Sequence, residues 1–327
     1  MKRVLFSIFA GLIALSAQAD LINGAGASFP APIYFKWANT YYKETGNKIN
    51  YASIGSGGGI KQIDSKIVDF GATDDPRTLS EISTIGQLQF PTVMGGVVPV
   101  FNIKGVSNLV LDGPTLADIF QGKITVWNDP QIAKLNTGVN LPSIAITLIT
   151  RADSSGTSAV FTDYLSMVST QFKETIGKSK TPRWKGNVAS GKGNAGVAAF
   201  VKQIPGGIGY VEYAFVKQGK LNAVSLKNKH GQLVDASASA FLDAAASADW
   251  SVPGMIVNLN NQDKGWPITA ATFILVYKEG NPNTQNVLKF FDWAFTRGDA
   301  LALELEYVPL PKSVQSAIRD VWSKNIK

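Results

Sequence analysis

The chain has 327 residues and a formal net charge of +7; 45% of the residues are hydrophobic, 17% are charged, and there is no cysteine. This composition excludes a disordered chain, a disulfide scaffold and a cysteine nucleophile or thiolate metal site. The single histidine, His230, lies in a segment that predicts a hairpin turn, so a catalytic triad or histidine-rich metal centre has little support. We therefore expect no catalytic residue, no metal and no cofactor.

Residues 1–19 have the pattern of a secretory signal peptide. Lys2 and Arg3 precede a short apolar run, and a small-x-small cleavage site ends at Ala19. The run is too short to span a membrane. We expect cleavage after Ala19 and a mature protein in the periplasm. Loss of Lys2 and Arg3 lowers the formal charge from +7 to +5. Without a basic tract, this charge suits a small anion and predicts no nucleic-acid partner.

In the first third of the chain, turns of small residues alternate with helical and strand-like segments. The turn Ala25–Pro30 precedes a helix predicted over 30–43. A strand over 49–54 leads to a second turn, Gly55–Gly59, and to a short helix over 58–66. A further strand begins at Val68 and runs into a loop at Asp74, and residues 97–101 form another apolar strand.

The same pattern recurs after residue 140. A strand over 144–150 leads to a third turn, Arg151–Thr157, and a helix over 157–169. Strands over 208–211 and 272–277 and a helix over 283–296 follow. This alternation predicts α/β domains with mainly parallel sheets. No linker marks a domain boundary, as expected for a chain that crosses between two domains more than once.

The three turns of glycine and hydroxyl residues all stand at predicted helix starts. A helix N-terminus presents unpaired backbone N–H groups and the positive end of the helix dipole. Three such ends that converge would form a cradle for a tetrahedral anion. Anion binding is therefore the central hypothesis from the sequence.

From end to end, the chain resembles the periplasmic phosphate-binding proteins of bacterial ABC phosphate importers, the PstS type. The resemblance implies a two-lobed periplasmic-binding-protein fold of type II, with the ligand in the interdomain cleft. It also implies capture of inorganic phosphate and delivery to the membrane permease of the importer, by a protein that we expect to be a monomer. The matching stretches are Gly24–Pro32, Ile54–Gly59, Val68–Asp74, Ile119–Ile124 with Trp127, Arg151–Ser158, Gly207–Tyr213 and Trp266–Thr269.

The resemblance further implies a lobe division and a set of ligand contacts. One lobe would comprise residues 21–98 plus 266–327, and the other 99–265. The family often has threonine where Ser28 stands and serine where Gly57 stands, so we expect altered affinity rather than lost binding. The implied contacts are Ser28, the Phe29 backbone N–H, Ser56, Asp74, Arg151, Ser155, Gly156 and Thr157.

Asp74 is the informative member of this set, because a carboxylate repels an anion unless the anion can donate a hydrogen bond. Phosphate near neutral pH carries a proton and sulfate carries none, so an ionised Asp74 would select phosphate; such sites reject analogues by roughly 10⁴–10⁵. The alternative is a helix-capping aspartate before Pro76. Arg151 adds a planar fork for two oxygens, and we expect Asp153 to hold this guanidinium in place. The alternative is a surface ion pair between Arg151 and Asp153.

Other functions are weighed against this one. Another tetrahedral oxyanion, such as arsenate, sulfate or molybdate, is the alternative ligand, and Asp74 does not discriminate against arsenate. A secreted phosphate-releasing hydrolase lacks a serine elbow motif and clustered metal ligands. Residues 186–193 fit all but the last position of a P-loop, and we interpret them as a structural turn before a helix at 197–201. A surface or adhesion protein with the same fold is a third class.

Overall fold

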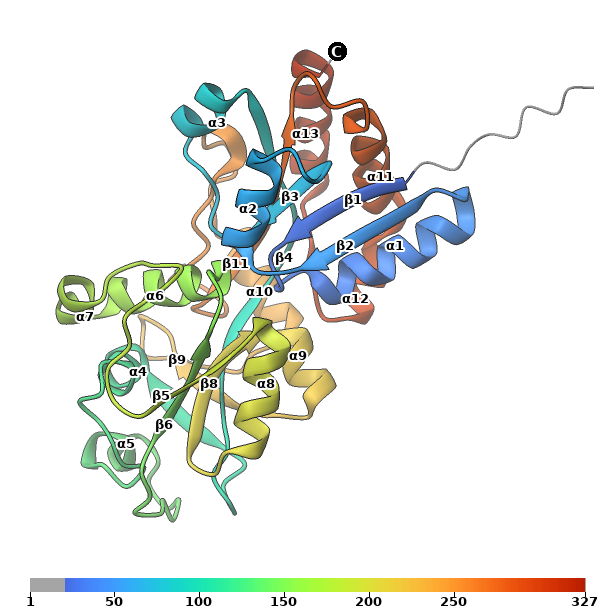
Figure 1. The fold of residues 1–327 in the computed structure, drawn as a ribbon. Coiled ribbons are helices and arrows are strands. Elements are labelled where there is room, and N and C mark those ends of the chain that lie inside the picture. Colours follow the sequence, from blue (N-terminus) through green and yellow to red (C-terminus); the bar gives the residue numbers. More distant parts are fainter. Residues whose placement is uncertain (1–20, 327) are drawn as a thin grey trace, which may run out of the picture.

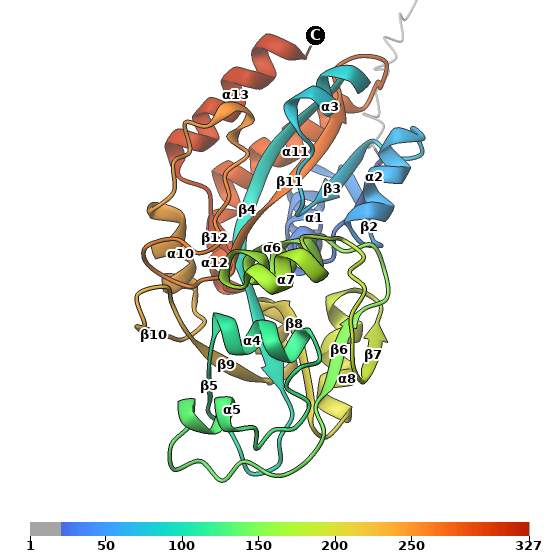
Figure 2. The same cartoon turned by 90° about the vertical axis from the view of Figure 1, so that its left-hand side faces the viewer.

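One long buried strand, β4 (Gln87–Phe101), passes through both halves of the molecule (Figure 2). The computed structural model describes residues 21–326; the predicted signal peptide and its cleavage site lie outside them. From Gln87 to Gly96, β4 pairs with β11 (Thr269–Tyr277), and from Val97 onward it pairs with β8 (Gly207–Glu212). The described strands thereby form one continuous sheet, in the order β2-β1-β3-β11-β4-β8-β6-β7 along its main path. The fold is two-lobed α/β, as predicted. The prediction of mainly parallel sheets is wrong, because six of the eleven strand pairs among residues 21–326 are antiparallel.

The upper lobe in Figure 1 is built on three strands that run parallel to one another. Beside the last of them lies β11, which runs antiparallel to it, and β4 runs antiparallel to β11. The first helix of this lobe begins after Pro30, buries Tyr34 and Trp37 against the sheet, and ends at Gly46, whose φ of 78° suits glycine. The three parallel strands are β1 (Leu21–Gly26), β2 (Lys48–Ser53) and β3 (Phe70–Thr73), and the first helix is α1 (Ala31–Thr45). The remaining elements of this lobe are α2 (Ser56–Asp64), α3 (Leu79–Ile85), α11 (Thr284–Arg297), α12 (Asp299–Glu304), β12 (Val308–Pro309) and α13 (Lys312–Asn325).

The lower lobe continues the sheet from β4 through β8 to two strands parallel to β8 and to each other. A three-strand ladder of β5, β9 and β10 joins it through β9. The other segments that follow β4 are β5 (Leu109–Asp112), α4 (Gly113–Phe120), α5 (Pro130–Leu135), β6 (Thr147–Arg151), α6 (Gly156–Val168), α7 (Thr170–Thr175), β7 (Val188–Gly191), α8 (Gly193–Gln203), α9 (Tyr213–Gly219), β9 (Asn222–Lys227), β10 (Leu233–Val234) and α10 (Ala238–Ala246). The next element, a 3₁₀ turn over Pro253–Met255, lies against α3 and β4 of the upper lobe.

Trp266 lies in the segment that leads into β11, next to the point where β4 changes its pairing partner. Its side chain is fully buried, and its indole N–H donates to the Val97 carbonyl at 2.9 Å. The Val97 N–H in turn donates to the Ile268 carbonyl at 2.8 Å. Two crossing segments are therefore bonded to each other where the lobes meet. Among residues 21–326, no helix combines the length and apolar character needed to cross a bilayer.

Most predicted elements are confirmed within a few residues, and three differ. The strand predicted over 97–101 is the end of the much longer β4, whose first part was missed together with β1. Ser56 is the first residue of α2 rather than part of a preceding turn. The segment interpreted as a structural turn over 186–193 contains β7. β7 has four residues, Val188–Gly191, too few to show the alternation of apolar and polar residues by which a strand is predicted. His230 lies in the predicted turn.

Candidate functional site

The three predicted turns meet where the two lobes touch. Gly156, at the start of α6, donates its N–H to Ser56 Oγ at the start of α2, across 3.1 Å. Gly57 donates its N–H to the Ser154 carbonyl at 3.0 Å. A Cβ built on Gly156 would lie 2.3 Å from Ser56 Oγ, so only glycine permits this approach. The sequence therefore places its glycines where two helix N-termini come into contact.

Gly57 also lies at this contact. A Cβ at residue 57 would lie 2.2 Å from the Ser154 hydroxyl oxygen. The departure from the serine that is common in the family therefore fits the close lobe contact of this chain. Because the Gly57 N–H is bonded to Ser154, this donor joins the lobes and is not free to bind a ligand.

Asp74 lies in the loop directly after β3 and is 4% exposed. Its Oδ1 accepts from the Thr272 hydroxyl at 2.8 Å, and its Oδ2 lies 3.5 Å from Ser56 Oγ. Burial raises the pKa of Asp74 to about 7, although the Thr272 hydroxyl, the charge of Arg151 and the Ser56 hydroxyl act in the opposite direction. Within residues 21–326, this carboxyl forms no ion pair with a cation. Asp74 is thus a buried acceptor whose pKa lies near neutral pH.

Arg151 ends β6 in the lower lobe and is held as the sequence predicted. Its Nε and Nη2 donate to the two oxygens of Asp153 at 2.9 and 2.5 Å. Burial alone would raise the pKa of Asp153, but Arg151 and the Gly193 N–H outweigh it and hold that pKa below its usual value. The third guanidinium nitrogen, Nη1, donates to Thr157 Oγ1 at 3.2 Å. The pair is a planar, nearly neutral unit with one edge turned toward Thr157.

Ser155 and Phe29 occupy supporting positions. Ser155 is the N-cap of α6, and its Oγ accepts from the Ser158 N–H at 3.0 Å. Phe29 is fully buried, and its carbonyl accepts from the Tyr307 hydroxyl at 2.6 Å. The predicted role of the Phe29 N–H as a ligand donor stays a prediction.

Asn194, in the first turn of α8, connects the two halves of the site and was missed by the sequence analysis. Its backbone N–H and its Nδ2 donate to Ser28 Oγ at 3.0 and 2.9 Å, and Nδ2 also donates to Thr157 Oγ1 at 3.2 Å. Its Oδ1 accepts from the Glu212 N–H at 2.9 Å. Glycines flank Asn194 closely at another helix start, the same signal that identified the other three turns. Thr272, the partner of Asp74, lies within β11, and no glycine turn marks it in the sequence.

Ser28, Ser56 and Thr157 share one hydrogen-bonding property. Each hydroxyl oxygen accepts two N–H bonds: Ser28 from Asn194 twice, Ser56 from Asp74 and Gly156, Thr157 from Arg151 and Asn194. A hydroxyl has two lone pairs and one hydrogen. With both lone pairs occupied, each of these groups can act toward a ligand only as a donor. The single hydrogen of Ser56 is already directed at Asp74 Oδ2, at 3.5 Å, whereas Ser28 and Thr157 keep theirs for a ligand. The described site therefore combines two hydroxyl donors, and a third that Asp74 holds, with one carboxyl able to accept.

Comparison with known proteins agrees with this geometry. Residues 14–297 match the PBP superfamily domain. The chain is 51% identical to the phosphate-binding protein PstS of Pasteurella multocida over 100% of this chain and 96% of the relative. It is 50% identical to the PstS of Haemophilus influenzae over 95% of each.

Two solved structures share the fold at low identity. A high affinity periplasmic phosphate-binding protein bound with phosphate superposes with a TM-score of 0.74 at 21% identity, covering 91% of this chain and 93% of the other. An ABC-type phosphate transport receptor from Vibrio cholerae gives a TM-score of 0.58 at 18% identity, covering 89% of this chain and 100% of the other. From the full-length match to PstS relatives at about half identical residues, we conclude that this chain belongs to the PstS family of the PBP superfamily.

Proposed function

We propose that this protein captures inorganic phosphate in the periplasm and delivers it to the membrane permease of an ABC importer, without chemical conversion of the ligand. The observation that carries the proposal is the set of three hydroxyls whose lone pairs are already occupied, beside the buried Asp74 carboxyl. The names of the PstS relatives, which are transport proteins rather than enzymes, point to the same function.

The donors suit an anion because they are neutral or neutralised. Ser28 and Thr157 would each donate one O–H to a phosphate oxygen, together with backbone N–H groups at helix starts. Ser56 would add a third O–H by turning its hydrogen from Asp74 to the ligand. Arg151 would add a charged donor while Asp153 holds its plane. These groups come from both lobes, so a ligand that touches all of them favours the closed arrangement over the open one.

Asp74 would supply selectivity. When ionised, its carboxylate accepts a hydrogen bond from a protonated phosphate oxygen, whereas a sulfate oxygen brings no hydrogen and meets like charge. A pKa of about 7 means that binding of a proton-donating anion can favour the ionised form of Asp74 near neutral pH. Arsenate, which carries protons in the same way, is the alternative ligand.

The remaining parts of the proposal concern the whole molecule. We infer that the lobes comprise residues 21–98 plus 266–327 and residues 99–265, that the signal peptide is cut after Ala19, and that the mature protein is a monomer. The long strand β4 supports two hinge-connected lobes, because its pairing partner changes from β11 to β8 after Gly96. The permease as partner follows from family membership.

Isothermal titration of the mature protein with phosphate, arsenate and sulfate tests the ligand directly. We expect tight binding of phosphate, binding of arsenate and no measurable heat with sulfate at the same concentrations. Tight sulfate binding, or none with phosphate, would contradict the proposal. Incubation with a phosphate monoester is the control for the hydrolase alternative, and release of inorganic phosphate would favour that alternative.

A further inference from the structure

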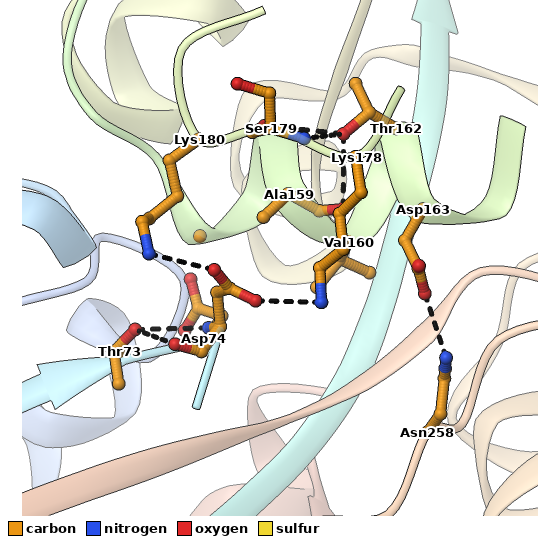
Figure 3. A network of polar contacts seen from close by, with 12 residues as sticks. Thr73, Asp74, Ala159, Val160, Thr162, Asp163, Lys178, Ser179, Lys180 and Asn258 are labelled. Atoms are coloured by element: carbon orange, nitrogen blue, oxygen red, sulfur yellow. Dashed lines mark hydrogen bonds and ion pairs between the residues drawn. The ribbon is translucent and has the colours of Figure 1, made fainter. Parts of the chain in front are cut away.

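Asp75, the residue after Asp74, makes two ion pairs that span the lobes. Its Oδ1 lies 2.9 Å from Lys178 Nζ, and its Oδ2 lies 2.9 Å from Lys180 Nζ. Figure 3 labels the two lysines, whose side chains point toward the loop that contains Asp74. Asp75 lies in the upper-lobe loop after β3, and both lysines lie in the lower-lobe loop after α7. One carboxylate thus binds two cations that are more than 100 residues away in the chain.

The lysine loop is attached firmly to the ligand-site turn. The Ser155 N–H donates to the Lys180 carbonyl at 2.9 Å, directly before the start of α6. The Ser179 N–H donates to Thr162 Oγ1 at 2.9 Å, about two turns further along that helix (Figure 3). Any motion of the third turn away from the upper lobe would therefore carry both lysines with it.

The Asp75 loop is fixed just as closely to the upper lobe. The Asp75 N–H donates to Thr73 Oγ1 at 3.1 Å, and the Thr73 hydroxyl donates to the Asp75 carbonyl at 2.9 Å. Asp74, Asp75 and Lys178 also line one cavity of about 100 Å³. The ion pairs thus lie beside the candidate acceptor, Asp74, and involve the neighbouring carboxylate of Asp75.

Asp75 and Lys178 are both charged at neutral pH. Burial alone would raise the pKa of Asp75, but Lys178 and Lys180 outweigh it and hold that pKa below its usual value. Burial alone would lower the pKa of Lys178, but Asp75 raises it above its usual value. The Asp75 side chain is 17% exposed, and Lys178 and Lys180 are 49% and 34% exposed. The pairs are therefore partly shielded from solvent, so salt screens them incompletely.

We propose that Asp75, Lys178 and Lys180 form an electrostatic latch that stabilises the closed arrangement and thereby sets ligand affinity from outside the ligand site. The proposal rests on the phosphate-binding function for its affinity part only. A ligand that needs the closed arrangement binds with an apparent Kd divided by the closed fraction. Loss of the latch lowers that fraction, so the apparent Kd rises although no ligand contact changes.

The first experiment measures lobe closure without ligand. Because the chain has no cysteine, Ser83→Cys on α3 and Lys134→Cys on α5 provide one spin label in each lobe, and pulsed electron resonance reports the distance between them. Asp75→Asn in this background should move the ligand-free distribution toward longer distances, and Asp118→Asn should not. Asp118 is the matched control, since its ion pair with Lys123 at 2.8 Å lies within the lower lobe. Identical distributions for Asp75→Asn and the parent would overturn the latch.

The second experiment measures affinity. Asp75→Asn and the Lys178→Gln/Lys180→Gln double variant should each raise the phosphate Kd by about threefold to tenfold, the range that partly exposed ion pairs support. The triple variant should add little to either. Arsenate affinity should fall by the same factor, because a latch alters closure and not ligand recognition. Additive effects in the triple variant, or a changed phosphate-to-arsenate ratio, would overturn the proposal.

The two readouts separate failure of the latch from failure of the function. If the parent binds no phosphate but the spin-label distance still responds to Asp75→Asn, the latch stands and phosphate binding does not. If phosphate binds tightly and neither readout responds to Asp75→Asn, phosphate binding stands and the latch does not.

Discussion

The loops after β3 and β6 hold equivalent places, each at the carboxyl end of a strand where the lobes meet, yet their carboxylates differ. Asp153, after β6, binds both nitrogens of one edge of Arg151, and its pKa lies below the usual value. Asp74, after β3, accepts from the hydroxyls of Thr272 and Ser56, and burial raises its pKa to about 7. The same residue type is thus a fixed charge in one loop and a titratable acceptor in the other.

We propose that this difference divides the recognition of an anion between the lobes. The lower lobe would contribute a cation whose charge Asp153 balances, so the site would not attract every anion with a net positive charge. The upper lobe would contribute Asp74, whose ionised form accepts a hydrogen bond from a ligand that carries a hydrogen. Four predictions test this division, beginning with the largest expected effect.

Asp74→Asn should abolish the discrimination that the upper lobe supplies. We expect the ratio of sulfate to phosphate Kd to fall by at least about 100-fold, because an amide can donate to an unprotonated oxygen. Competition titrations of both anions measure the ratio. Asp75→Asn is the neighbouring control, since it should change both affinities and leave their ratio alone. Unchanged selectivity in Asp74→Asn would refute the role given to Asp74.

Arg151→Ala should weaken phosphate binding by about 10- to 100-fold, the loss typical of a hydrogen bond to a charged group together with an orphaned Asp153. The phosphate-to-sulfate ratio should change far less than in Asp74→Asn. Calorimetry of both anions gives the comparison, with the exposed Arg183→Ala as control. An affinity change below about threefold would place Arg151 outside the site.

The pH dependence of stability should reveal Asp74 directly. Its folded pKa of about 7 lies above the unfolded value of 3.8, so the folded state binds more protons between these limits. The contribution of Asp74 to stability is therefore fully present below pH 4 and is lost as the pH rises through 7. Relative to the parent, Asp74→Asn should gain about 2 kcal/mol in free energy of unfolding between pH 5 and pH 8. Urea unfolding without phosphate measures this, and a pH-independent difference would contradict the raised pKa.

Ser28→Thr should have the smallest effect, a change in phosphate Kd of less than about threefold, because the added methyl group leaves the hydroxyl donor in place. The Ser28 oxygen already accepts two bonds from Asn194, which fix its position. Calorimetry under the conditions used for the parent is sufficient. Complete loss of binding would show that this turn differs from that of the family.

The sequence identified the local parts of this protein well. Helical spacing predicted α1 and α11, and glycine turns predicted the starts of α2 and α6 to within two residues. These features depend on residues a few positions apart, where backbone geometry and side-chain period are decisive. The contact between Arg151 and Asp153 was anticipated for the same reason, since only one residue separates them.

Only the tertiary structure decided which distant groups meet. Thr272 reaches Asp74 across 198 positions of the chain, Asn194 reaches Ser28 across 166, and Lys180 reaches Asp75 across 105. Such contacts depend on how β4 passes between lobes and on which strand pairs with which, and no periodicity within one segment encodes them. The sequence by itself therefore determined the chemistry available to the site, while the packing of the two lobes determined the protonation of Asp74, the orientation of the hydroxyls and the partners of Asp75.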